Sequence, residues 1–212
     1  SPSPQAGLDQ SVCGLSATLN AAASPYSGSW SGAGNFSAPT NPNSGVTSTS
    51  YGTYSYVWTE FNAAPCPAKT DTVKISFIEQ PVSDAGADQT LCGKTTNLAA
   101  KLSVATSTGF WTVPTGITLS NYNIINPVAN ASDFGTYTLF WTETNTAVCA
   151  PSTDSVVISF VPATSPDAGI DNQVCVSVYQ LSAIPSFGFG SWTYSGPGIL
   201  TFTSINDPNA TI

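Results

Sequence analysis

Five cysteines are the residues of this sequence with the clearest chemical potential. Three of them end the same short pattern at intervals of about 80 residues, namely Cys13, Cys92 and Cys175. The other two, Cys66 and Cys149, follow the first and the second of these. Thiols at such regular places are typical of disulfide bonds that stabilise small modules in an oxidising compartment.

Each complete repeat contains two cysteines, so we expect one bond between Cys13 and Cys66 and a second between Cys92 and Cys149. Closing loops of about 55 residues would stabilise each module by about 4 kcal/mol in the chain-entropy model. Cys175 has no partner in this scheme, because we expect its module to be truncated. The alternative is that all five cysteines are reduced, buried thiols.

Catalytic chemistry has few residues to build on. The chain has 12 acidic residues and four lysines, and it contains neither arginine nor histidine. Without histidine it lacks the usual general base, the Ser-His-Asp arrangement and the commonest zinc ligand. The acidic residues recur singly at equivalent places of the repeats, as Glu60 and Glu143 do, which favours a structural role. We therefore predict that the chain is not an enzyme.

Two pairs of aspartates lie where the repeats meet: Asp84 with Asp88, and Asp167 with Asp171. Carboxylate and backbone oxygens are the ligands that Ca²⁺ prefers, so a calcium ion that stiffens each junction is one hypothesis. No other cofactor is expected. The denser D-x-D-x-D spacing of calcium loops is missing, and the alternative is that these residues belong to ordinary turns and linkers.

Longer repeats surround these side chains. Ala-Gly-x-Asp begins the pattern at Ala6, Ala85 and Ala168, and a Gly-Thr-Tyr strand follows at 52–60 and at 135–143. Self-similarity of this kind identifies a repeat architecture. The period predicts three units, which are residues 1–81, residues 82–164 and, as the N-terminal part of a truncated module, residues 165–212.

Composition predicts an all-β fold. Only 8% of the residues are charged, turn-forming residues are frequent, and no long segment has helical periodicity. Proline in the linkers 79–84 and 161–167 predicts that successive modules form a semi-rigid, extended string. In the second unit we expect strands at 89–92, 97–102, 109–113, 117–119, 135–143 and 155–160.

Several aromatic positions resemble those of immunoglobulin-like sandwiches. The segment from Asp133 to Tyr137 has the D-x-G-x-Y form of a tyrosine corner, and Trp111 resembles the buried tryptophan of the third strand. Immunoglobulin domains carry a cysteine two residues after that tyrosine, whereas this chain has Leu139 there. The aromatic residues expected to be structural are Trp30, Tyr54, Trp58, Trp111, Tyr137, Trp141 and Trp192.

The Asp-Ala-Gly-x-Asp opening and the G-T-Y-x-x-x-W-T strand are similar to the PKD-like or Ig-like repeats of giant Bacteroidota surface proteins. The gliding-motility adhesins exported by the type IX secretion system are the most similar class. The resemblance implies tandem β-sandwich modules at the cell surface, in contact with neighbouring modules and with the secretion or motility machinery. It also implies O-glycosylation at Thr72 and Ser155, although an Asp-Ser/Thr pair equally suits the start of a strand.

The net charge of −8 argues against a nucleic-acid partner, because phosphate contacts need clustered Lys and Arg. No apolar run approaches the ~20 residues that span a bilayer, so membrane insertion is not expected.

We expect a secreted, extracellular adhesin filament that mediates or projects adhesion to a surface or polysaccharide, including adhesion during gliding. The alternatives are a passive stalk or spacer, and a carbohydrate-binding accessory region of a secreted polysaccharide-degrading enzyme. Sugar stacking would use aromatic side chains outside the strand cores, namely Tyr26, Phe36, Tyr51, Phe61, Tyr122, Phe187, Phe189 and Tyr194.

Overall fold

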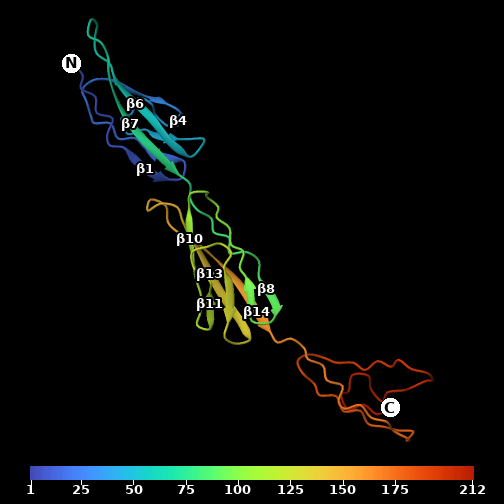
Figure 1. The fold of residues 1–212 in the computed structure, drawn as a ribbon. Coiled ribbons are helices and arrows are strands. Elements are labelled where there is room, and N and C mark those ends of the chain that lie inside the picture. Colours follow the sequence, from blue (N-terminus) through green and yellow to red (C-terminus); the bar gives the residue numbers. More distant parts are fainter.

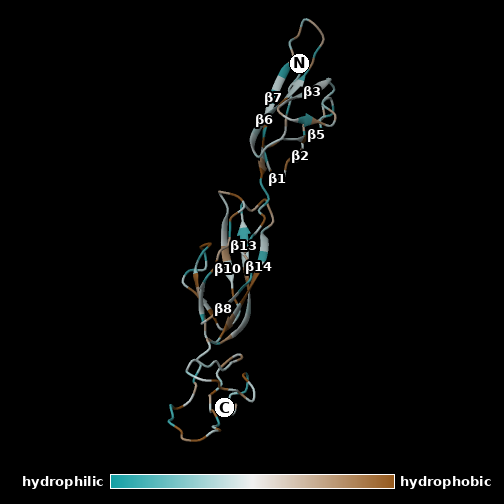
Figure 2. Cartoon of the chain, turned by 90° about the vertical axis from the view of Figure 1, so that its right-hand side faces the viewer, coloured by the Kyte–Doolittle hydropathy of each residue, from teal (hydrophilic) through white to brown (hydrophobic).

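The computed structural model describes residues 1–212 and consists of strands, turns and loops. Two sandwich modules and a C-terminal segment follow one another in an elongated chain (Figure 1). Figure 2 shows the same succession after a turn of 90°. The prediction of an all-β chain of tandem modules is therefore confirmed. None of the elements is a helix with the length and apolar character needed to cross a membrane.

Module 1 contains seven strands in two sheets. The larger sheet has the order β1-β7-β6-β3, and the smaller has the order β2-β5-β4. The strands are β1 (Gln10–Cys13), β2 (Ser16–Thr18), β3 (Gly28–Gly32), β4 (Asn35–Phe36), β5 (Gly45–Thr47), β6 (Gly52–Glu60) and β7 (Lys69–Ile78).

Module 2 repeats this arrangement. Its larger sheet has the order β10-β13-β14-β8, and its smaller sheet has the order β11-β12-β9. The strands are β8 (Gln89–Cys92), β9 (Thr95–Asn97), β10 (Thr108–Thr112), β11 (Ile117–Leu119), β12 (Val128–Ala131), β13 (Gly135–Thr144) and β14 (Ser152–Val161).

The long strands follow the alternation of their side chains. In β13, Leu139 and Trp141 are fully buried, whereas Phe140 between them is 44% exposed. Successive residues of a strand point to opposite faces, so the apolar set lies in the core and the Thr-rich set faces solvent. In β14, the buried residues are Val156, Ile158 and Phe160.

Each module encloses its own hydrophobic core, and neither cluster of buried residues includes side chains of the other module. A tryptophan pair lies at the centre of each. The ring centroids of Trp30 and Trp58 are 5.2 Å apart, and those of Trp111 and Trp141 are also 5.2 Å apart. Aromatic pairs at this separation contribute about 0.5–1.5 kcal/mol beyond the area that they bury.

The first strand of each module determines where its cysteine lies. β1 pairs in parallel with β7 and sets Cys13 opposite Ile78, the last residue of β7. β8 pairs with β14 in the same way and sets Cys92 opposite Val161. The first-strand cysteine thus lies at the C-terminal end of its module, whereas the β6–β7 loop (61–68) projects beyond the N-terminal end (Figure 1).

Two of the expected strands differ from the structure. The segment expected at 97–102 is a regular strand only at β9, Thr95–Asn97, and β12 at Val128–Ala131 was not predicted. Beyond β9, Leu98 and Ala100 still donate backbone N–H groups to the segment before β12, and Lys101 pairs with Asp84 of the incoming linker. β12 was missed because its sequence, Val-Ala-Asn-Ala, combines only one β-branched residue with an asparagine.

Residues 162–212 contain no named strand, and their pairings are isolated bridges, Asp167 to Ile184 and Gln180 to Thr211. The first bridge is equivalent to that between Asp84 and Lys101 in module 2. The indole of Trp192 donates to the carbonyl of Asp207 at 2.8 Å, as Trp111 does to Ile124 at 3.0 Å. The segment therefore keeps local contacts of a module without its sheets.

Candidate functional site

The most distinctive chemical feature of the chain is a disulfide bond between Cys13 of module 1 and Cys149 of module 2. It joins the end of β1 to the β13–β14 loop, and 136 positions of sequence separate its two cysteines. The predicted pairings of Cys13 with Cys66 and of Cys92 with Cys149 are wrong. Cys66, Cys92 and Cys175 are free, exposed thiols.

Strand geometry explains why the cysteines of one module do not pair. Cys13 lies beside Ile78 at the end of β7, while Cys66 precedes Lys69 at its start. Ten residues of β7 separate these ends, which is roughly 30 Å at about 3.3 Å per residue. A disulfide needs Cα atoms within about 7 Å, and the Cα atoms of Cys13 and Cys149 are 5.1 Å apart.

Hydrogen bonds fix the linker beside this disulfide. The side-chain amide of Gln80 donates to the carbonyl of Ala150 at 2.7 Å, and that of Asn145 donates to the carbonyl of Glu79 at 2.9 Å. The sulfur of Cys149 lies 3.6 Å from the same carbonyl. The β13–β14 loop therefore holds the linker through polar contacts and is itself bonded to β1 of module 1 through Cys13. We call the linker 79–86, this loop (145–151), the loop 103–107 and Cys13 the module junction.

Serine residues also attach the linker to module 2. The backbone N–H of Ser83 donates to the hydroxyl of Ser152 at 3.0 Å, and the Ser83 hydroxyl donates to the Ser152 carbonyl at 2.6 Å. The N–H of Val82 donates to the hydroxyl of Ser103 at 2.8 Å. Two loops of module 2, 103–107 and 145–151, and the first residue of β14 thus contact the linker, which gives the predicted semi-rigid connection a physical basis.

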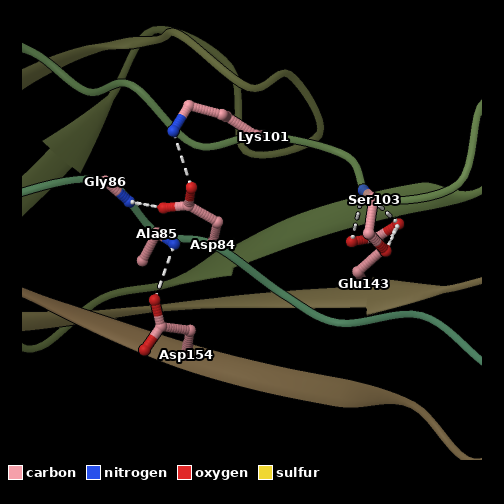
Figure 3. Close-up of polar contacts among 7 residues, drawn as sticks. All are labelled: Asp84, Ala85, Gly86, Lys101, Ser103, Glu143 and Asp154. Atoms are coloured by element: carbon pink, nitrogen blue, oxygen red, sulfur yellow. Dashed lines mark hydrogen bonds and ion pairs between the residues drawn. The ribbon is translucent and has the colours of Figure 1, made fainter.

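Half-buried aspartates accept hydrogen bonds from the backbone at the point where the chain enters each module, as Figure 3 shows for Asp154. Asp154 accepts the N–H of Ala85 at 2.8 Å, and Asp71 accepts the N–H of Ala6 at 2.7 Å in module 1. These two aspartates precede the glycosylation candidates, and each holds the segment that leads into the first strand of its module.

Glu143, next to the module junction, is a fully buried carboxylate. It accepts the N–H of Ser103 at 2.9 Å and that of Val104 at 3.1 Å, and it also accepts the hydroxyls of Ser103 and Ser107. Burial alone would raise the pKa of Glu143, but the Ser107 hydroxyl and the donors of Ser103 and Val104 together lower it below its usual value. The group is therefore a charged anchor for the loop 103–107.

Glu60, the equivalent residue of module 1, is buried with fewer partners. The indole of Trp58 donates to one of its oxygens at 3.4 Å, and the other oxygen has no hydrogen-bond partner. The two modules thus differ at this position, because the loop between β2 and β3 makes no hydrogen bond to Glu60, whereas the equivalent loop of module 2 makes several to Glu143.

The calcium candidates are engaged by protein groups. Asp84 accepts the ammonium of Lys101 at 2.7 Å and the N–H of Gly86 at 2.8 Å, and these two donors lower its pKa. Asp88 accepts the N–H of Val157, and Asp167 accepts that of Gly169, each at 2.8 Å. Asp171 is exposed. No three Asp, Glu, His or Cys side chains come together here, and calcium binding at the junctions stays a prediction.

The glycosylation candidates, Thr72 and Ser155, lie on the solvent face of β7 and β14. Thr72 stands opposite Val57 and Ser155 opposite the exposed Phe140. Both hydroxyls are accessible, and their modification stays a prediction.

The aromatic positions expected to be structural have different environments. Tyr137 donates its hydroxyl to the carbonyl of Asp133 at 3.0 Å, as a tyrosine corner does. In module 1 the hydroxyl of Tyr54 lies 2.5 Å from that of Ser50 instead. Trp30, Trp58, Trp111 and Trp141 are buried, and Trp192 is half-buried.

Solved structures share this architecture. A three-domain fragment of titin, domains I67–I69 in an E-to-A mutated variant, superposes with a TM-score of 0.51 at 11% identity, over 98% of this chain and 86% of that one. The fold is that of tandem immunoglobulin-like sandwiches. The insect immune protein hemolin matches 76% of this chain and 47% of its own, at 12% identity and a TM-score of 0.48. No protein-family model and no curated protein sequence matches the chain.

In Ig-like terms, the larger sheet of each module contains the first, third, sixth and seventh strands, and the smaller contains the second, fourth and fifth. The disulfide that ties the second strand to the sixth in antibody domains is absent. In its place, the tryptophan pair fills the core and the single disulfide lies between Ig-like modules.

Sequence reasoning missed the polar residues of the junction. Gln80, Asn145 and the serines at 83, 103 and 152 are short polar residues in loops, which composition alone does not distinguish from any other turn. One signal was available: Asn62 and Asn145 hold the same place, four residues before the loop cysteine of each module.

Proposed function

We propose that this chain is a stretch of a secreted cell-surface adhesin filament, in which covalently joined Ig-like modules hold an adhesive surface away from the cell. The observation that carries the proposal is the disulfide between Cys13 and Cys149. A bond within a module would stabilise one core, whereas a bond between modules fixes one rigid body to the next. Persistent disulfides also favour an extracellular location.

The junction also restrains how the two modules can reorient. A flexible tether of Gly and Ser would let two modules reorient freely, but here the linker contains Pro81 and hydrogen-bonds to two loops and to the start of β14 in module 2. Each module adds the length of a ten-residue strand, about 33 Å, to the filament. Many such modules would project a distal tip far from their anchor.

Adhesion itself is assigned to exposed aromatic rings. Tyr51 is 42%, Phe61 48% and Tyr122 43% exposed, and all three lie outside the cores. Rings of this kind can stack on the apolar faces of sugars, so an extracellular polysaccharide is the proposed partner. By contrast, Phe36 packs edge-on against Tyr56 with centroids 5.9 Å apart and is less available. Gliding motility and type IX export rest on the sequence resemblance.

The experiment is a binding assay of the oxidised chain, residues 1–212, on a panel of immobilised polysaccharides and abiotic surfaces. We expect saturable binding that the combined change Tyr51→Ser, Phe61→Ser and Tyr122→Ser weakens at least tenfold. The matched control is Phe140→Ser, which removes an equally exposed ring from a sheet face. Absence of binding on every surface would instead favour the passive spacer. Binding confined to one polysaccharide would favour the accessory region of a degrading enzyme.

A further inference from the structure

Cys92 stands in module 2 where the bonded Cys13 stands in module 1. Each lies opposite the last residue of the final strand, and the glycine that follows it donates to that residue, from Gly14 to Ile78 at 2.8 Å and from Gly93 to Val161 at 3.0 Å. Both glycines have a positive φ, 89° and 104°, which turns the chain away at the same point. The free thiol of Cys92 therefore lies at the C-terminal end of module 2 in the geometry that is bonded one module earlier.

Cys66 reproduces the other half of the bond. Its N–H donates to the carbonyl of Ala63 at 3.1 Å, and the N–H of Cys149 donates to that of Thr146 at 3.2 Å. Each cysteine thus ends the same turn of a loop that projects from the N-terminal end of its module. Cys66 and Cys92 lie at opposite ends of the two-module unit, so they do not pair with each other.

We propose that Cys92 and Cys66 are open halves of further inter-module disulfides, each made with an Ig-like module of the same kind. Cys92 bonds the loop cysteine of a module stacked on the C-terminal end of module 2. Cys66 bonds the first-strand cysteine of a module stacked on the N-terminal end of module 1. The proposal concerns assembly and is independent of whether the chain adheres to anything.

The reaction is oxidation of two thiols by a small disulfide such as oxidised glutathione. The Cys92 thiolate attacks that disulfide, forms a mixed disulfide and releases one glutathione thiolate. The loop-cysteine thiolate then attacks the Cys92 sulfur and displaces the second glutathione. Two protein thiols thus become one disulfide, their two protons are released, and the oxidant gains two electrons.

The test inserts a second copy of residues 79–161 between Val161 and Pro162 of the full chain, so that a complete module with its own linker follows module 2. After oxidation by glutathione, we expect bonds from Cys13 to Cys149 and from Cys92 to the copy's Cys149. The number of reactive thiols should stay at three, as in the chain itself, although the copy adds two cysteines. Maleimide labelling counts the thiols, and peptide mapping without reduction assigns the bonds.

Two variants of the extended chain test which cysteine bonds Cys92 and whether the loop of Cys66 can form the same bond. Changing the copy's Cys149 to Ser should leave Cys92 reactive and raise the count to four. Replacing residues 144–151 of the copy with residues 61–68 should preserve the bond to Cys92, because it supplies the loop that carries Cys66. The proposal is overturned if Cys92 stays reactive in the extended chain, or if it bonds Cys175 or a cysteine of its own module. Failure of the grafted loop to bond would overturn the part that concerns Cys66.

Discussion

Glu143 shows how much a single buried charge depends on its neighbours. Its carboxylate accepts hydrogen bonds from two backbone N–H groups and two hydroxyls, whereas one oxygen of Glu60 has no partner. Hydrogen bonds to charged groups are worth about 1.5–3 kcal/mol each, and a buried charge without partners is costly. The same residue type is thus stabilising in one module and poorly satisfied in the other.

Glu143→Gln should therefore destabilise module 2 by about 2–3 kcal/mol, because the amide places a donor against donors. Glu60→Gln is the matched control and should change module 1 by less than about 0.5 kcal/mol or stabilise it. Calorimetry of the oxidised chain can follow both transitions. Equal losses in the two modules would contradict the distinction.

The stability of module 2 should also fall in acid. The donors around Glu143 hold the pKa of that carboxyl below its unfolded value, and Lys101 and Gly86 do the same for Asp84. Stabilisation from a group with a lowered pKa is present above the unfolded pKa, about 4, and is lost as the pH falls through the folded one. The unfolding free energy should decline between about pH 5 and pH 2, and it should decline less steeply in Glu143→Gln. Parallel pH profiles would refute this account.

At the scale of elements, the tryptophan pair explains a glycine at the start of each third strand. A Cβ atom built on Gly109 would lie 2.2 Å from the ring of Trp141, and one on Gly28 would lie 2.1 Å from that of Trp58. Both rings are buried in close-packed cores and have little room to move away from such an atom. The strand can therefore approach the ring only where a side chain is missing.

We expect Gly109→Ala to destabilise module 2 by about 1–3 kcal/mol, the usual cost of overpacking, with a matching loss for Gly28→Ala in module 1. Gly190→Ala provides the control, since nothing lies within 4 Å of its Cβ position. Chemical denaturation followed by tryptophan fluorescence measures all three. A neutral Gly109→Ala would mean that the β10–β13 contact adapts more readily than described.

Strand alternation and the repeat made most of the fold predictable. The pattern around Leu139 and Trp141 decides which face of β13 is buried, and the period of the cysteines transfers that result to module 1. β12 was not predictable, because it is short, has only one β-branched residue and is held by its neighbours β9 and β11. The disulfide was not predictable from cysteine counts, since two cysteines per repeat fit bonds within modules and between them equally well. The parallel pairing of β1 with β7 decides the matter, and this pairing depends on contacts distant in sequence.

For the whole molecule, the disulfide changes which residues carry tension. When the chain is pulled from its ends, force passes from Cys13 directly to Cys149, and the residues between them bear none of it. Cys13→Ser should therefore lengthen the fully extended chain by roughly 450 Å, from the 136 residues inside the bond at about 3.3 Å each. Single-molecule pulling measures this length, and reductant should reproduce it in the unaltered chain. Cys92→Ser should leave the length unchanged, and full extension of the oxidised chain without reductant would contradict the load path.

The long sequence separation between Cys13 and Cys149 also determines when the disulfide can form during synthesis and export. A chain that emerges from its N-terminus exposes Cys13 first, and module 1 can complete its sheets while that thiol is still reduced. The bond can close only after the β13–β14 loop has emerged and module 2 has brought it to the linker. Each cross-link therefore forms only after the following module has emerged, so a reduced junction marks the most recently emerged modules of the chain. The oxidation state of the cysteines would then record how far assembly had advanced.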